Sequence, residues 1–313
     1  MAVIVLTNRL DPTADVVVDV LNRRGAEVLR ADLDDLEIAA ELVEGRWVGE
    51  IGAGHRSVSI SEVTGVYYRR PSRPGTPTGL DGDVARWVAD ERRWGVRGVL
   101  VALPRTAWLS WPPAIHAAEH KPYALAAAAM AGLTVPRTIV TNLPAPAADF
   151  ARRASPVLYK AFRGGPVRHD NRTVLTYATP VTADQIDDSV RVAPVTLQQR
   201  IDKVRDVRIT YVDGRTFAVS PTRAGVAPLD WRDDHEANTW AQVELPDIVR
   251  DRLRCLCDEL GLRFCAADFS VDHHGQWHHL DLNPVGQWAW CHPLRDSIAE
   301  ALADALTRKP FPS

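Results

Sequence analysis

The chain has 313 residues and a formal net charge of −3 at pH 7; 46% of its residues are hydrophobic and 25% are charged. This composition is ordinary for an enzyme of two or three packed subdomains, and it excludes a largely disordered chain and a strongly basic protein that binds nucleic acid in bulk. No apolar run of about 18 residues and no basic leader before an apolar stretch occurs, so we expect a cytoplasmic protein with no membrane partner. The net charge of −3 predicts that the protein has no nucleic-acid partner.

The first 70 residues predict a Rossmann-like start. We expect a strand at Ala2–Thr7, a helix that begins at Asp11-Pro12-Thr13 and ends at Gly25, and a strand at Glu27–Asp32. Neither G-x-G-x-x-G nor G-x-x-x-x-G-K-[ST] is present, so the usual dinucleotide and P-loop phosphate cradles are absent from the sequence. Further short strands are expected at Trp47–Ile51, Val58–Ile60 and Val66–Arg70.

After this start, helical patterns cover residues 83–98 and 112–132. The second is restarted at Lys121-Pro122, because proline is favourable in the first turn of a helix. Strands then dominate, so we place a boundary into a larger α+β part near residues 115–135. The expected later elements are strands at Thr138–Thr141, Val157–Phe162, Thr173–Tyr177, Val195–Ile201, Asp206–Val212 and Thr216–Ser220, and helices at Asp247–Leu260 and Leu294–Leu306.

Residues 264–288 predict a β-hairpin with its turn at His273–Gln276. Strand residues alternate between the two faces, and directly opposed residues share a face, so the turn fixes the pairing. The expected pairs are Asp272 with Trp277, Ser270 with His279, and Asp268 with Asp281.

One face of this hairpin collects oxygen ligands, since Asn283 points the same way as Asp281 and Asp268. Two carboxylates and an amide oxygen suit Mg²⁺, which usually takes its other ligands from water and from the phosphates of a substrate. The alternative is a solvated edge hairpin whose aspartates face water. The magnesium interpretation is favoured because Leu280 and Leu282 are expected to bury the opposite face.

Two isolated lysines stand out, because arginine greatly outnumbers lysine in this chain. Lys121 begins a helix and Lys160 lies in an apolar strand, where an unpaired ammonium is costly. A phosphate partner explains both, while a lysine extending from the edge of a sheet is the alternative for Lys160. The strand that contains Gln198, Gln199 and Ile201 is a candidate for reading the edge of an adenine base.

Two arginines are candidates for the chemistry. Arg208 lies mid-strand between apolar neighbours, so it points either toward a site or into an ion pair with Asp206 on the same face. Arg232, in Asp230-Trp231-Arg232, could clamp a carboxylate or an acyl phosphate with two hydrogen bonds.

Four histidines of the hairpin suggest zinc, but their spacing does not match a zinc motif and neighbouring strand residues face opposite sides. We expect them to be surface residues. No Ser/His/Asp or G-x-S-x-G arrangement occurs, which favours a ligase that activates its substrate with ATP over a hydrolase with a covalent intermediate. The four hairpin histidines considered for zinc above are His273, His274, His278 and His279.

The order of these parts resembles the ATP-grasp superfamily across nearly the whole chain. The motifs that carry this resemblance are His120-Lys121-Pro122, Gly132–Thr138, Tyr159-Lys160, Gln198–Ile201, Asp206-Val207-Arg208, Asp268 and Asp281–Pro284. Shorter strings are similar to the graspetide synthetases, the macrocyclases related to microviridin maturases that crosslink ribosomal precursor peptides. These strings are Tyr68–Pro71, Asp230–Arg232 and Asn283–Trp288.

The resemblance implies roles for the candidate residues. Lys121 and Lys160 would bind the ATP phosphates, Gln198–Ile201 the adenine, and Arg208 the transferring phosphate or acyl phosphate. The ligands of the Mg²⁺ ions would be Asp268, Asp281 and Asn283. The sequence departs from the family at three positions: His120 stands where Asn is frequent, Gln199 where Glu is common, and Asp281 where Glu is frequent.

It also implies an α/β chain, α+β in its C-terminal part, with an ATP-grasp fold behind a Rossmann-like pre-ATP-grasp domain. We expect this domain at 1–115, a central ATP-grasp subdomain at 116–200 and a C-terminal subdomain with the magnesium site at 201–313.

The function implied is the ATP-dependent activation of Asp or Glu side chains of a precursor peptide, followed by ω-ester or ω-amide crosslinks to Ser, Thr or Lys. The peptide partner would supply a leader and a core, residues 163–195 are our candidate for docking the leader, and a homodimer is expected. Two alternatives stay open: an amide ligase for a free amino acid or small metabolite, and an inactive ATP-binding module that carries or senses a peptide.

Overall fold

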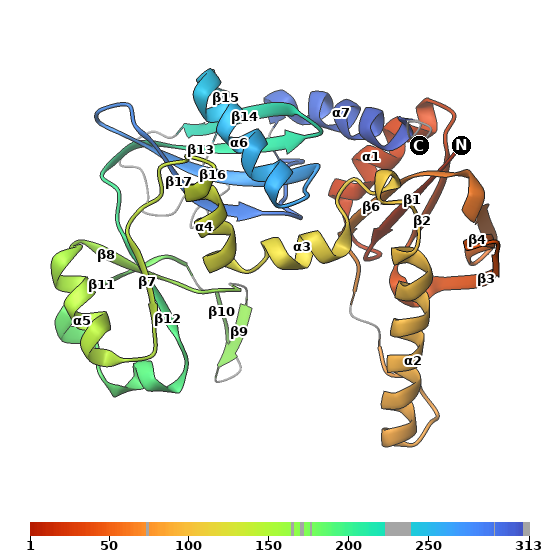
Figure 1. Ribbon diagram of the computed structural model, residues 1–313, viewed down its shortest axis with the longest axis horizontal. Helices are drawn as coiled ribbons and strands as arrows, with labels where there is room; N and C mark the ends of the chain where they lie inside the picture. The colour runs from red at the N-terminus through yellow and green to blue at the C-terminus, as the bar shows by residue number, and fades with distance from the viewer. Residues whose placement is uncertain are drawn as a thin grey trace.

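The computed structural model describes residues 1–72, 75–163, 166–169, 172–175, 177–222, 239–290 and 292–308 (Figure 1). Its N-terminal sheet has the order β2–β1–β6 and is parallel, with β1 at Ala2–Thr7, β2 at Glu27–Ala31 and β6 at Val63–Arg70. Helix α1 (Pro12–Arg23) joins the first two strands, and the Asp11 side chain caps it by accepting hydrogen bonds from two backbone N–H groups of its first turn. The expected strand–helix–strand start is confirmed.

A second, antiparallel sheet follows β2, with β3 (Leu36–Val43), β4 (Arg46–Ala53) and β5 (Arg56–Ser59). Strand β3 was not predicted from the sequence, because its Glu and Ala residues favour helices and few of its side chains are buried. Two helices lead out of this region, α2 (Gly82–Val101) and α3 (Pro112–Ala118). Much of α2 is exposed, and its buried residues are Ala85 and Leu100.

The last helix, α7 (Arg295–Thr307), returns to the N-terminal sheet and packs beside α1 (Figure 1). Its backbone comes so close to β6 that a side chain at Gly65 would overlap the carbonyl of Leu306. Glycine is therefore required at this crossing. The two ends of the chain thus share one hydrophobic core.

The central sheet is antiparallel and has the order β11–β8–β12–β7. Helix α5 (Pro144–Arg153) covers one face through Ala147, Phe150 and Ala151, and it was not predicted from the sequence. The elements of this region are α4 (Lys121–Met130), β7 (Thr138–Thr141), β8 (Val157–Lys160), β9 (Pro166–His169), β10 (Arg172–Leu175), β11 (Thr179–Val181) and β12 (Val195–Gln199).

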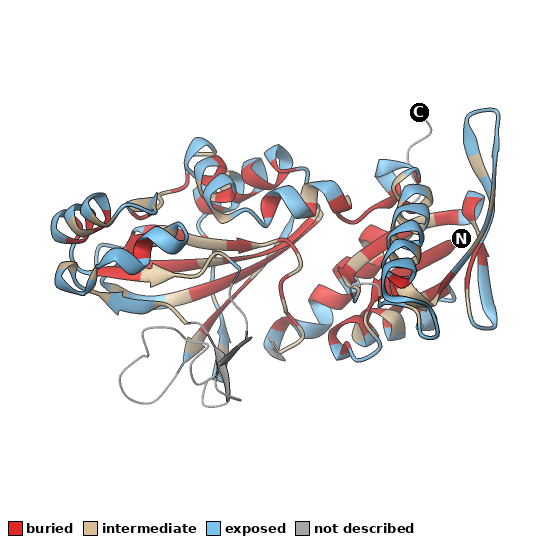
Figure 2. Ribbon diagram, turned by 90° about the horizontal axis from the view of Figure 1, so that it is seen from below, coloured by how far each residue is buried: buried red, intermediate tan, exposed pale blue. Residues whose placement is uncertain are grey.

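The C-terminal sheet is also antiparallel, with the order β15–β14–β13–β16–β17. Helix α6 (Asp247–Glu259) packs on it through Val249, Leu253 and Leu256. Figure 2 shows the buried residues concentrated along the sheets and on the inward faces of the helices. The strands are β13 (Lys203–Val212), β14 (Arg215–Thr222), β15 (Thr239–Gln242), β16 (Phe264–Asp272) and β17 (Trp277–Asn283).

This α/β architecture, with its α+β C-terminal part, agrees with the fold class expected from the sequence. In the described part of the chain, no helix is both long enough and apolar enough to cross a membrane.

Candidate functional site

The β16–β17 ribbon confirms one predicted pairing and corrects two. Asp268 lies opposite Asp281, as expected. Nearer the turn the pairs are Ser270 with His278 and Val271 with Trp277, so the expected pairs Ser270–His279 and Asp272–Trp277 are wrong by one residue.

The cause is a shorter turn that is compensated by a β-bulge. The N–H of Asp272 donates to the Gln276 carbonyl at 3.1 Å, so the turn consists of His273–Gly275 and is one residue shorter than expected. The Asp272 carboxylate stabilises this turn by accepting hydrogen bonds from the backbone N–H groups of His274 and Gln276, each at 2.9 Å. A register shift at Leu280 restores the alignment before Asp281. A bulge re-aims the side chains beside it. Leu280 accordingly lines a cavity and is only half-buried, whereas Leu282 is buried as expected.

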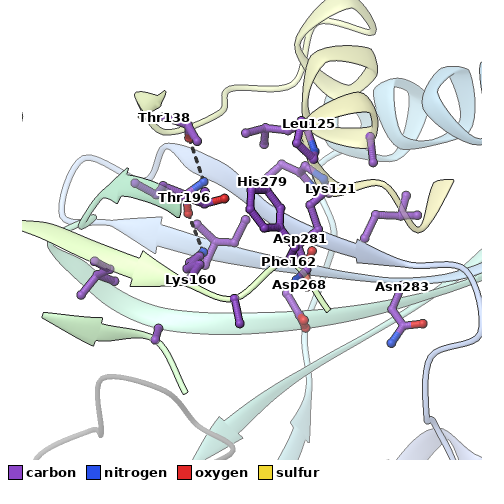
Figure 3. Close-up of a pocket in the computed structure, with 18 of the residues that line it drawn as sticks. Lys121, Leu125, Thr138, Lys160, Phe162, Thr196, Asp268, His279, Asp281 and Asn283 are labelled. Carbon is purple, nitrogen blue, oxygen red and sulfur yellow. Dashed lines mark hydrogen bonds and ion pairs between the residues drawn. The ribbon is translucent and has the colours of Figure 1, made fainter. Parts of the chain in front are cut away.

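This cavity, of about 420 Å³, lies between the central sheet and the ends of β16 and β17 (Figure 3). Side chains from α4, β8 and β12 reach it from one side and those of the ribbon from the other. The structure therefore brings together eight of the ten candidate residues. They are Lys121, Lys160, Gln198, Gln199, Ile201, Asp268, Asp281 and Asn283.

Lys121 faces the ribbon from the N-terminus of α4. Its Nζ lies 2.8 Å from Oδ2 of Asp281, and both side chains are about one-third exposed, at 34% and 28%. Burial alone would raise the pKa of Asp281, but the ammonium groups of Lys121 and Lys160 outweigh it and hold this pKa below its usual value. Asp281 is therefore an ionised carboxylate that already binds a cation.

Lys160 does not extend from a sheet edge. Its strand, β8, lies between β11 and β12, so the edge alternative is wrong. Its Nζ donates to Oε1 of Gln198 at 2.5 Å, and the Gln198 amide donates to Thr138 at 3.1 Å (Figure 3). The lysine is thus held across the central sheet, with its ammonium at the cavity.

Arg208 is 8% exposed and binds Asp268 rather than Asp206. Its Nη1 lies 2.9 Å from both carboxylate oxygens of Asp268, and its Nη2 donates to the Gln287 carbonyl at 3.2 Å. The alternative of an Asp206–Arg208 pair is therefore wrong. Arg208 does not itself line the cavity formed by the described residues, but lies behind Asp268.

Asp206 has its own partners, Lys203 at 2.5 Å and the Ser270 hydroxyl at 2.7 Å. Burial raises the pKa of Asp206, although the Lys203 ammonium opposes this. All three residues line the cavity, and none of them was predicted from the sequence as a site residue. The signal for Lys203 was present, since it is as isolated among arginines as Lys121 and Lys160.

His279 was predicted to be a surface residue, and this is wrong. It is 1% exposed, packs edge-on against Phe269 with ring centroids 5.1 Å apart, and lines the cavity beside Asp281. Burial lowers the pKa of His279 to about 4; Lys160 also lowers it, and the Asp281 carboxylate opposes both. Its imidazole is therefore neutral near pH 7.

His278 is also mostly buried and bonds Oδ2 of Asp272 at 2.9 Å; this hydrogen bond lowers the pKa of Asp272 to about 2.

Asn283 lies at the end of β17, where the chain turns. Its Oδ1 accepts a hydrogen bond from the N–H of Val285 at 3.0 Å, and its carbonyl accepts from Gly286 at 3.2 Å. Arg232 lies outside the described residues. So do parts of the candidate docking segment 163–195, namely residues 164–165, 170–171 and 176.

The donor set fits Mg²⁺ shared with phosphate. Two carboxylates are direct cross-strand partners, and each already binds a cationic side chain. Within the described ranges, no cluster of three or more His, Cys, Asp or Glu side chains could hold a metal by itself. An ion here would complete its coordination with Asn283, water and phosphate oxygens, as Mg²⁺ commonly does.

Comparisons with known proteins agree with this fold. Residues 2–116 match the family model described as MvdD pre-ATP grasp domain. The chain is similar in structure to a RiPP-associated ATP-grasp ligase from Chryseobacterium gregarium in complex with ADP and a leader and core peptide. The TM-score is 0.88 at 24% identity, over 97% of this chain and 96% of that one.

The macrocyclases MdnC and MdnB from Microcystis aeruginosa MRC are similar too, MdnC being bound with the precursor peptide MdnA. Their TM-scores are 0.82 and 0.79, each at 26% identity over 98% of this chain and 99% of theirs. None of the curated proteins matches this chain significantly.

Proposed function

We propose that this chain, which has the ATP-grasp fold with a pre-ATP-grasp domain at its N-terminal end, is an ATP-dependent peptide macrocyclase. It activates Asp or Glu side chains of a ribosomal precursor peptide and joins them to Ser, Thr or Lys side chains as ω-esters or ω-amides. The observation that carries this proposal is the facing pair Asp268 and Asp281, each bound to a cationic side chain at a cavity between two sheets.

ATP is the cofactor that this cavity accommodates. Lys121 and Lys160 bring positive charge from α4 and β8 to the same space, which suits a triphosphate. Gln198, Gln199 and Ile201 follow the cavity along and beyond β12, and we assign the adenine to this edge.

Asp268, Asp281 and Asn283 would hold Mg²⁺ at the end of the ribbon. When bound, the ion neutralises charge on the phosphoryl group during its transfer.

The reaction has two steps. A carboxylate oxygen of the peptide attacks the γ-phosphorus, the bond to the β–γ bridging oxygen breaks, and ADP leaves, which gives an acyl phosphate. A hydroxyl or amine of the same peptide then attacks the acyl carbon, loses its proton to water, and displaces inorganic phosphate. Holding both reacting side chains in one site makes the second step effectively intramolecular.

We assign Arg208 and Arg232 to the transferring phosphoryl group and the acyl phosphate. Arg208 lies directly behind Asp268, which it contacts through both carboxylate oxygens, and this proximity to the cavity supports the assignment. A guanidinium suits the task because it stays charged and offers donors in a planar fork.

We further propose the subdomain boundaries 1–115, 116–200 and 201–313, leader docking along 163–195, a homodimer, and a cytoplasmic location. The precursor peptide binds through a leader and a core. The boundaries follow the order of the sheets along the chain, the homodimer and the leader and core follow from the resemblance, and the docking segment and the location keep the expectations from the sequence.

The test is release of ADP by the full chain, with and without the precursor peptide encoded beside its gene. Mass spectrometry of the peptide should show the loss of one water per crosslink. Turnover that requires a small amino acid and ignores the peptide would identify the metabolite ligase. Absence of turnover with every substrate would favour the carrier module.

A pair of variants connects the test to the site. Asp281→Asn removes one carboxylate charge and should lower turnover by about a hundredfold or more. The matched control is Asp272→Asn, at the turn of the same ribbon, which should keep wild-type turnover. Equal turnover of Asp281→Asn and wild type would overturn the magnesium assignment.

A further inference from the structure

Arg69 is a charged residue with a fully buried side chain. It lies on β6 of the N-terminal sheet, and its side chain is 0% exposed. A charge at such depth is retained only where several polar partners compensate for its lost hydration. Its partners therefore indicate what the residue does.

Those partners lie mainly in the turn that follows β17. Nη1 of Arg69 donates to the carbonyl of Val285, and Nη2 donates to Oε1 of Gln287 at 2.5 Å. Its Nε lies 3.7 Å from the Asp11 carboxylate at the start of α1. Thr13 of the same helix also donates to Oε1 of Gln287, at 2.6 Å. The N-terminal sheet thus holds this turn from one side.

Arg208 holds the same turn from the other side, through the Gln287 carbonyl. Between the two arginines there is no room for a side chain at Gly286, whose Cβ would overlap Ala266 and lie 3.0 Å from Nη2 of Arg208. The turn is therefore fixed by contacts from two different sheets.

The turn begins at Asn283, and its geometry sets that side chain. Oδ1 of Asn283 accepts from the N–H of Val285, whose carbonyl is the one that Arg69 binds. A displacement of Val285 thus moves Asn283 directly. Residues that orient a metal ligand commonly change metal affinity or activity tenfold to a hundredfold when they are altered.

We propose that Arg69 is a positioning residue for the magnesium-binding end of β17, and that it acts through the turn at Asn283–Gln287. The inference rests on the proposed function, because it takes Asn283 as a ligand. It assigns to the N-terminal domain a direct part in forming the cation site.

The test compares Arg69→Lys with Arg263→Lys. Lysine keeps the charge but cannot reproduce the fork that reaches both Val285 and Gln287. Arg263 is a matched control, because it also joins the C-terminal sheet to the N-terminal part. It bonds Asp213 at 2.8 Å and the Trp108 carbonyl at 3.0 Å without lining the cavity.

Two readouts are needed, thermal unfolding and calorimetric titration of Mg²⁺ into the ADP-bound protein. Arg69→Lys should raise the Mg²⁺ concentration for half-saturation about tenfold, and raise the Mg²⁺ requirement of peptide-dependent ADP release in parallel. Arg263→Lys should lower the melting temperature and leave both Mg²⁺ values at the wild-type level. A merely structural role for Arg69 would make the two variants alike, which would overturn the inference.

Gln287→Met provides a second route should Arg69→Lys fail to fold. It removes the acceptor that Arg69 and Thr13 share while keeping the side-chain length, and it should shift the Mg²⁺ requirement in the same direction. An unchanged requirement in Gln287→Met would also contradict the inference. If the wild-type protein itself bound ADP with no dependence on Mg²⁺, the proposed function would fail instead.

Discussion

The ammonium nitrogen of Lys121 lies 2.8 Å from a carboxylate oxygen of Asp281, although 160 positions separate the two residues in the chain. Lys121 begins α4 and Asp281 lies near the end of β17. This ion pair closes the cavity on the ribbon side and keeps the carboxylate ionised. Both side chains retain access to the cavity. An incoming Mg²⁺ ion can therefore take the place of the Lys121 ammonium beside Asp281, and a phosphate group can take the place of the Asp281 carboxylate beside Lys121.

Replacing Lys121 by methionine keeps the apolar stem and removes the charge. Hydrogen bonds to charged groups contribute about 1.5–3 kcal/mol, so ATP affinity should fall about tenfold to a hundredfold, as measured by calorimetry. The pKa of Asp281 should also rise, since its main stabilising cation is lost. Arg153→Met is the control, because Arg153 pairs with Asp149 on the exposed side of α5. Equal ATP affinity in both variants would show that Lys121 does not bind the nucleotide.

Arg208→Lys should impair the chemical step more than nucleotide binding. The substitution keeps the charge but cannot hold Asp268 and the Gln287 carbonyl together. We expect kcat to fall about a hundredfold or more, with the ATP dissociation constant changed less than threefold. Arg205→Lys on the same strand is the control, since Arg205 lies over the Trp277 ring and away from Asp268. Parallel losses in kcat and in ATP affinity would assign Arg208 a binding role instead.

The sequence predicted the main layers because their elements carry strong local signals. The buried strand Ala2–Thr7 and the capped helix at Pro12 are examples. It did not predict β3 or α5, whose compositions oppose or only weakly support the structures they form. Tertiary contacts decide such elements, since intrinsic propensities are small.

For the site, the candidates were found by residue type, and their partners depended on long-range contacts. The bulge at Leu280 could not be read from the sequence, because alternation along a strand assumes an unbroken ladder. His279 was assigned to the surface from its residue type and spacing, which say nothing of the packing that buries it in the cavity wall. The partner of Arg208 was equally hidden, since it depends on the register between β13 and β16, which places Asp268 directly opposite Arg208.

Gly286→Ala should destabilise the protein and displace Arg208. The added methyl group would overlap Ala266 and crowd Nη2 of Arg208, so we expect a loss of about 1–3 kcal/mol in the free energy of unfolding, with reduced turnover. The control is Gly95→Ala within α2, where nothing lies within 4 Å, and this change should stabilise the protein by about 0.5–1 kcal/mol. Denaturant unfolding measures both changes. An unchanged free energy of unfolding in Gly286→Ala would show that the turn can move to accommodate the methyl group.

His279→Leu should make the stability of the protein less sensitive to mild acid. In the folded chain the pKa of His279 is lowered to about 4, whereas the unfolded value is near 6.5. Between these values the unfolded state binds the extra proton, so the stability due to neutral His279 is complete above about pH 6.5 and is lost as the pH falls toward 4. One pKa unit corresponds to about 1.4 kcal/mol, so wild type should lose about 2 kcal/mol relative to His279→Leu between pH 7 and pH 5. Denaturant unfolding at both pH values measures this difference, and His55→Leu, in an exposed turn, should follow wild type. Parallel profiles of unfolding free energy against pH for wild type and His279→Leu would contradict this prediction. They would mean that His279 takes up its proton in the folded chain, so that the cavity wall tolerates a cation beside Lys160.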